Sequence, residues 1–411
     1  MVPAGAERRR RALRPGLALV FRRELRWLRR RPVLLFFTTI LPLFLMSLLM
    51  VVFNAGLPTE LPVAVLDRNG TDLSRAVIRM VDATSEIAIV EQVDDLAQGR
   101  HLILSGRVYG LLMLPLNLQR DAFAGRRPEV VFFSDNQHMT VGGILARGAA
   151  NAVGAAGAAV RVALRSSKGE PVELAQGALA PVPVQLNTLF NPALNYAHFL
   201  LAALLPAVLQ IIIVTTSAYS VGLDIEGRYR LATLRRLGGG LWPALFGKLL
   251  PHTLVYLVIY VLAEAALFDY LEMPLRGHPW LLVLAAILFI FACQLLGTLM
   301  VVVTLRMGPA LSIAGLLTAP AFGFMGVSFP RLGMNAFPHA WGALLPGTWY
   351  LQARVDQTIR GTPLDLSLPP IVILGAYVVV LACLCGLRLD TLGRRRLRRL
   401  ERPERTIEAP A

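Results

Sequence analysis

Val33–Phe53 reads VLLFFTTILPLFLMSLLMVVF, an apolar run of about the 20 residues that a helix needs to cross a bilayer. The residues that follow, about 54–191, form a long water-soluble stretch with no further run of this kind. Because lipid offers the backbone no hydrogen-bond partners, each apolar run is predicted to be a helix. Five more runs follow the soluble stretch, near Asn195–Ser217, Leu249–Phe268, Trp280–Leu305, Pro309–Phe329 and Pro369–Leu389.

This layout predicts a membrane all-α bundle of six transmembrane helices with an inserted extracytoplasmic α/β domain. The predicted segments are a basic arm (1–32), the first helix (33–53), the inserted domain (54–191), a five-helix domain (192–389) whose loop 219–248 is cytoplasmic, and a basic tail (390–411). Pro42 is expected to bend the first helix. That helix is too long for the core of a cleaved signal peptide, so it is expected to be retained.

The charges predict the orientation. Eleven Arg and two Glu give the arm a net charge of +9, loop 219–248 carries +3, and the tail from Arg388 carries +4, whereas the soluble stretch is nearly neutral. Since Lys and Arg stay on the cytoplasmic side, both termini are expected inside and residues 54–191 outside. A nucleic-acid site on the arm is disfavoured, because only Trp27 could stack on a base.

Gly16–Arg31 is predicted to be an amphipathic helix that lies in the membrane interface. Its apolar residues are Leu17, Val20, Phe21, Leu25 and Leu28, and its interfacial basic residues are Arg22, Arg23, Arg26, Arg29 and Arg30. Two interpretations remain open: the arm only anchors the topology, or it also docks a cytoplasmic partner.

The soluble stretch alternates strand and helix signals, which predicts an α/β domain. Strands are expected at Pro62–Leu66, Ile87–Val90, Val108–Leu114 and Val130–Phe133. A helix is expected over Thr71–Val81, and a long Ala- and Gly-rich helix between Gln137 and about Arg165. Neither this domain nor the membrane half shows the residue spacing of a catalytic or metal site.

The loop segment Asp224–Leu237, DIEGRYRLATLRRL, is predicted to be a helix held between two spans. It is either a solvated basic helix or one that transmits force from a cytoplasmic partner, and composition does not separate the two. Glu264 and His198 are expected near the outer ends of their spans, where Glu264 could reach the interface, so the deep spans are predicted to be nearly uncharged.

Four stretches resemble the membrane subunit of a type-2 ATP-binding-cassette (ABC) exporter, in the group with a large domain after the first helix. They are VAVLDRNGTDLSRAVIRMVDAT (Val63–Thr84), GRVYGLLMLPLNLQRDAFAGRRPEVVFFSDNQ (Gly106–Gln137), FNPALNYAHFLLAALLP (Phe190–Pro206) and AFPHAWGALLPGTWYLQARVDQTIRG (Ala336–Gly361). Their order and spacing carry the resemblance over nearly the whole chain from about residue 16.

The resemblance implies a dimer of membrane subunits, identical or paralogous, bound to two cytoplasmic ABC ATPase subunits. It also allows a periplasmic adaptor and an outer-membrane channel as partners, and implies the bacterial inner membrane as location. The implied ATPase-coupling residues are Asp224, Glu226, Arg228, Arg230, Thr233, Arg235 and Arg236. In the family's usual loop pattern, glycine stands at the place of Ala232 and glutamate at that of Arg235.

This chain has no phosphate-binding GxxxxGK[ST] motif, so it is not expected to be an enzyme or to bind a cofactor, and ATP and Mg would act through the ATPase. Relatives export drugs or lipophilic compounds, which suggests a lipophilic or amphiphilic cargo in multidrug efflux. The expected substrate path lies between the second and fifth spans of two subunits, at Ala203, Ala207, Thr215, Gly315, Thr318 and Gly323; small residues there could equally be packing positions. The alternative function is a membrane receptor or scaffold with a ligand-binding outer domain.

Overall fold

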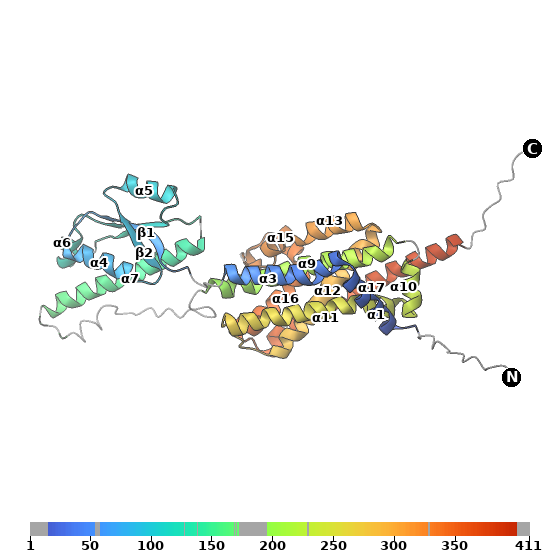
Figure 1. Ribbon diagram of the computed structural model, residues 1–411. Helices are drawn as coiled ribbons and strands as arrows, with labels where there is room; N and C mark the ends of the chain where they lie inside the picture. Colours follow the sequence, from blue (N-terminus) through green and yellow to red (C-terminus); the bar gives the residue numbers. More distant parts are fainter. Residues whose placement is uncertain are drawn as a thin grey trace, which may run out of the picture. The chain divides into compact units, whose positions relative to one another are not determined.

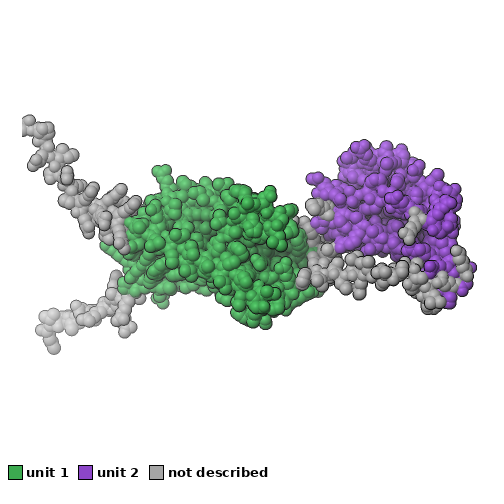
Figure 2. All heavy atoms as spheres, turned by 180° about the vertical axis from the view of Figure 1, so that it is seen from behind, with its two compact units in different colours: residues 1–56, 189–411 green, residues 57–188 purple. Residues whose placement is uncertain are grey.

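The computed structural model describes residues 15–53, 58–126, 128–137, 139–167, 169, 171, 195–227, 230–327 and 329–400. The chain divides into two compact units, one of residues 1–56 with 189–411 and the other of residues 57–188 (Figure 2).

The smaller unit is the α/β fold that the alternating pattern predicts. Its sheet has the order β2-β1-β3-β4, in which β1 pairs in parallel with β2 and β3, and β4 is antiparallel to β3. The strands are β1 (Leu61–Asp67), β2 (Ile87–Gln92), β3 (Gly110–Leu114) and β4 (Val131–Ser134). Each predicted strand is present, with bounds that differ by a few residues.

Helices cover both faces of this sheet, α4 and α7 on one and α5 on the other (Figure 1). The helices are α4 (Asp72–Asp82), α5 (Leu96–Leu104), α6 (Leu118–Phe123) and α7 (Met139–Ser166). Successive β1 side chains alternate between the two cores, Val63 and Val65 on the α4 side and Ala64 and Leu66 on the α5 side. The short helices α5 and α6 were not predicted.

In the larger unit, six helical stretches are long and apolar enough to cross a membrane, so the chain is a multi-pass membrane protein. They are Pro32–Val52, Ala197–Ile225, Leu241–Tyr270, Pro279–Thr304, Met307–Phe324 and Leu364–Leu392. The second span continues past the predicted end at Ser217 and the third begins before Leu249. The polar residues that made these ends look like loops, such as Ser220 and Asp224, are buried within the unit.

These spans are built from α2 (Pro32–Leu35), η1 (Phe36–Ile40), α3 (Leu41–Val52), α9 (Tyr196–Ile225), α11 (Leu241–Ala265), η2 (Ala266–Tyr270), α12 (Pro279–Thr304), α13 (Met307–Thr318), α14 (Ala321–Phe324) and α17 (Leu364–Leu400). Just before Pro42, where a bend is expected, the span contains the π-helical turn η1. Pro42 has no N–H for the carbonyl of Thr38, and a π-helical turn accommodates such a missing bond.

Shorter helices complete the unit. They are α1 (Leu17–Arg30), α10 (Arg230–Gly238), η3 (Arg331–Gly333), α15 (Ala336–Ala343), α16 (Pro346–Val355) and η4 (Asp356–Arg360). The helix α12 is central, since it packs against α9, α13, α16 and α17. From α16, Tyr350 stacks on Phe289 of α12 with ring centroids 4.7 Å apart, so the segment between the fifth and sixth spans belongs to the core of this unit.

Candidate functional site

The arm helix α1 has one buried face and one exposed face. Val20, Glu24 and Leu28, spaced four residues apart, are buried. Four of the five predicted interfacial arginines are exposed, namely Arg22, Arg26, Arg29 and Arg30. The buried face differs from the predicted apolar one, because it carries a carboxylate at its centre while Leu17 and Leu25 remain partly exposed.

This face rests on α10 and α11. The Gly16 backbone N–H donates to the Leu237 carbonyl at 2.8 Å, and Val20 packs with Leu234 and Ala244. A Cβ atom on Gly247 of α11 would lie 2.8 Å from the Leu17 carbonyl oxygen. The glycine therefore permits the close approach of α1 to α11, and the arm is held against the turn that joins α10 to α11.

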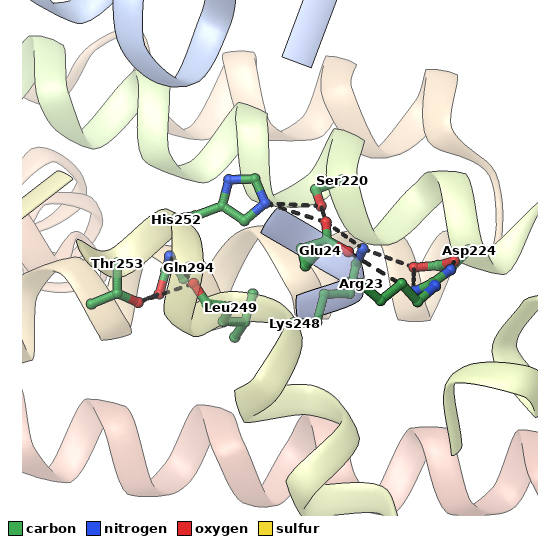
Figure 3. A network of polar contacts seen from close by, with 9 residues as sticks. All are labelled: Arg23, Glu24, Ser220, Asp224, Lys248, Leu249, His252, Thr253 and Gln294. Atoms are coloured by element: carbon green, nitrogen blue, oxygen red, sulfur yellow. Dashed lines mark hydrogen bonds and ion pairs between the residues drawn. The ribbon is translucent and has the colours of Figure 1, made fainter. Parts of the chain in front are cut away.

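Glu24 is the centre of a buried polar group, the Glu24 cluster, made of Arg23, Glu24, Ser220, Asp224, Lys248 and His252 (Figure 3). Glu24 Oε1 accepts hydrogen bonds from Lys248 Nζ at 2.9 Å and Ser220 Oγ at 3.0 Å. His252 Nε2 lies 3.3 Å from the same oxygen. One carboxylate of α1 thus joins α9 and α11.

Asp224, near the C-terminal end of α9, is the second carboxylate of the cluster. Its Oδ2 lies 2.7 Å from Lys248 Nζ, and its Oδ1 accepts a hydrogen bond from Arg23 at 2.6 Å. The Arg23 guanidinium also lies over the Trp27 ring, 4.2 Å from its centroid. Arg23 is therefore the one predicted interfacial arginine that faces the protein.

The charges of the cluster balance, because two carboxylates face Arg23 and Lys248. Burial alone would raise the pKa of Glu24, but the Lys248 ammonium and the His252 ring outweigh it and hold this pKa well below its usual value. The side chains of Glu24, Asp224 and Lys248 are at most 1% exposed. Removing one partner from such a cluster leaves an uncompensated buried charge.

The predicted coupling residues lie in different environments. Asp224 belongs to the Glu24 cluster, and Glu226 accepts a hydrogen bond from the Met307 backbone N–H at 2.6 Å, which caps α13. On α10, Arg235 pairs with Asp390 of α17 at 3.2 Å, whereas Thr233 and Arg236 are exposed.

Arg228 lies outside the described residues, and Arg230 begins α10. The predicted single helix Asp224–Leu237 is thus two elements, the end of α9 and the separate helix α10. Sequence reasoning missed Ser220, Lys248 and His252, although the four-residue spacing of the last two on α11 is a visible signal.

The predicted path residues divide into two groups. Ala203 and Ala207 are buried against Ala321 and Met325, and Thr215 and Thr318 bond to carbonyls of their own helices. By contrast, Gly315 and Gly323 face open space, where an added Cβ atom would contact nothing within 4 Å.

A second buried ion pair joins α11 to α16. Arg354 donates two hydrogen bonds to Glu264, the one from Nη2 to Oε2 at 2.9 Å. Glu264 is therefore buried in a bidentate pair and does not reach an interface, contrary to the expectation. Sequence reasoning missed Arg354, which lies 90 residues away.

Two comparisons with known proteins bear on this site. No curated protein matches the chain. The profile of the family described as "ABC-2 family transporter protein" matches residues 32–387, which include all six spans except the last residues of the sixth. This match extends over most of the chain, as the resemblance noted from the sequence predicts. The chain therefore belongs to the ABC-2 family of transporter proteins and is a membrane permease component of an ABC transporter.

Proposed function

We propose that the chain is the permease subunit of an ATP-driven exporter, with both termini and α10 in the cytoplasm and the α/β unit outside. The observation that supports this most is α10, a short basic helix between two spans and fastened to α1. The family implies a cytoplasmic ABC ATPase partner. ATP and Mg bind to that partner, and α10 with α1 passes its movement to α9 and α11.

The exposed faces of two spans support a second membrane subunit. Only 17% of the first span and 22% of the fifth are buried within this chain, compared with 72% of the fourth. The second subunit covers these faces, and the compound passes along the path near Gly315 and Gly323. Because the buried charges of the described spans are paired, the surface left for the cargo is apolar, which suits a lipophilic or amphiphilic compound.

The coupling role predicts different results for two neighbouring arginines. Arg236→Glu should abolish most binding of the ATPase, because the exposed charge is reversed where α10 would meet a partner carboxylate. Arg235→Glu should also weaken α10 itself, since it places a carboxylate against Asp390. Co-purification of the ATPase and its substrate-stimulated hydrolysis measure both effects.

Two controls separate docking from local structure. Asp390→Arg added to Arg235→Glu restores the internal pair and should restore the midpoint of thermal unfolding. Arg26→Glu reverses an exposed charge on α1 instead of α10, and tests whether the arm contributes to ATPase binding. Full ATPase binding by Arg236→Glu would contradict the coupling role, and a stable complex with a regulator and no ATPase would favour a receptor or scaffold.

The orientation has its own test. In a variant without Cys293, Cys383 and Cys385, a cysteine at Ala124 should react with an impermeant maleimide added to intact cells. A cysteine at Ala232 should react only after permeabilisation. Both side chains are exposed, so accessibility within the protein does not bias the comparison. The reverse labelling pattern would refute the proposed orientation.

A further inference from the structure

One face of α11 carries a polar residue at every fourth position, over a stretch where a membrane helix is normally apolar. We call this row the polar ladder: Lys248, His252, Tyr256, Tyr260 and Glu264. All five are buried. Each step rises about 6 Å and the whole row about 24 Å, most of the roughly 30 Å hydrocarbon core.

Polar side chains of α9 and η1 face the part of the ladder from Lys248 to Tyr256. Within the Glu24 cluster, Asp224 contacts Lys248, and Ser220 Oγ lies 3.5 Å from His252 Nε2. One turn further along α9, the Thr216 hydroxyl lies beside that of Tyr256, as does Thr38 of η1. These partners on α9 also repeat every four residues, so the ladder continues beyond the Glu24 cluster.

The other end of the ladder reaches the Glu264–Arg354 pair. Tyr260 lies next to Tyr350, with ring centroids 6.3 Å apart. These four residues line a cavity of about 10 Å³, close to the space that a single water molecule needs.

The ladder has many unsatisfied polar atoms. Among the described residues, eleven buried side-chain N or O atoms have no hydrogen-bond partner, and eight of them belong to the ladder or to residues facing it. These are Glu24 Oε2, Thr38 Oγ1, Thr216 Oγ1, His252 Nδ1, Tyr256 OH, Tyr260 OH, Tyr350 OH and Arg354 Nε. On the face of α11 toward α12, in contrast, Thr253 donates to Gln294 at 2.8 Å. Buried polar atoms nearly always bond to protein or to ordered water, so we expect ordered water molecules along the ladder.

We propose that buried waters bond to these atoms and that the polar ladder is a proton path between the Glu264–Arg354 pair and the Glu24 cluster. One water between two hydroxyls spans about 5.6 Å with two hydrogen bonds, close to one ladder step. Tyrosine hydroxyls, the His252 ring and water each donate and accept, so a proton that enters at one end releases another at the opposite end. Ionisable residues inside membrane proteins commonly form such relays.

Proton flux through the chain alone tests this, without ATP or a transported compound. The purified protein is placed in liposomes that contain a pH-sensitive dye, with valinomycin and potassium to hold the membrane potential at zero, and a pH step is applied. The wild type should dissipate the gradient faster than empty liposomes. Tyr256→Phe, which removes only the ring hydroxyl, should reduce the protein-dependent rate at least fivefold, and so should Tyr260→Phe.

The matched control is Tyr377→Phe, because the Tyr377 hydroxyl donates to the Ala343 carbonyl away from the ladder. Its flux should equal that of the wild type. Hydroxyl-radical labelling should also modify Tyr256 and Tyr260 despite their burial, and leave the buried Met325 unmodified. A wild-type rate equal to that of empty liposomes, or equal rates for the wild type and both ladder variants, would overturn the proton path even if labelling occurs.

Discussion

Glu24→Ala is expected to detach the arm helix α1 from the membrane unit and to lower the midpoint of thermal unfolding by on the order of 5 °C. The carboxylate accepts hydrogen bonds from Lys248 and Ser220 inside the protein. Its loss leaves the Lys248 ammonium buried with one carboxylate, Asp224, which is already shared with Arg23. Breaking a buried ion pair by removing one partner typically costs about 3–5 kcal/mol.

A double variant distinguishes charge imbalance from lost packing. Glu24→Gln with Lys248→Met removes one charge of each sign and leaves the Arg23–Asp224 pair, so it should recover most of the lost midpoint. Arg22→Ala, on the exposed face of α1, should change the free energy of unfolding by less than about 0.5 kcal/mol. A midpoint for Glu24→Ala within 1 °C of the wild type would show that the Glu24 cluster contributes little to holding the arm.

The pH dependence of this difference follows from the lowered pKa of Glu24. In the unfolded chain the carboxyl titrates near 4.5, and in the folded protein well below it. The stabilisation is therefore fully present above pH 4.5 and is lost only as the pH falls through the folded pKa. The midpoint difference between the wild type and Glu24→Gln should stay constant from about pH 8 to pH 5 and shrink below that.

The α/β unit could be predicted closely because its signals are local. Each strand is a short apolar run that ends at turn residues, such as Pro62–Leu66 before Asp67 and Asn69, and the sheet contains all four. Thr71 and Ser74 form the capping box that begins α4. The helices α5 and α6 were missed because they are short and follow no clear apolar period.

The buried charges could not be predicted in the same way. Hydropathy treats a polar residue as the end of a span, so Asp224 and Lys248 appeared as loop residues. Their burial depends on partners far away in sequence, since Glu24 and Lys248 are 224 residues apart. The same holds for Glu264. Its partner Arg354 lies 90 residues away in α16, and the sequence shows that this segment precedes the last span but not which helix it packs against. The four-residue spacing on α11 was visible, but its meaning depended on which face of that helix is buried.

Arg354→Gln is expected to have the second large effect, because it leaves the Glu264 carboxylate buried among Tyr260 and Tyr350 without its cation. The Arg354 side chain is 2% exposed, and both of its terminal nitrogens donate hydrogen bonds to the Glu264 carboxylate. The expected cost is about 3–5 kcal/mol, seen as a lower midpoint of thermal unfolding. Arg354→Lys should recover only part of it, because an ammonium cannot make the planar two-bond contact.

Arg360→Ala is the matched control, since Arg360 pairs with the buried Asp356 one turn earlier in the chain but is itself 52% exposed. Asp356 keeps a hydrogen bond from the Thr362 hydroxyl at 3.4 Å, so loss of the half-exposed guanidinium should lower the free energy of unfolding much less than Arg354→Gln does. Arg354→Gln combined with Glu264→Gln removes both charges at once and should be more stable than either single variant. Additive losses in the double variant would mean that the two residues stabilise α11 and α16 independently, and that the ion pair does not hold these helices together.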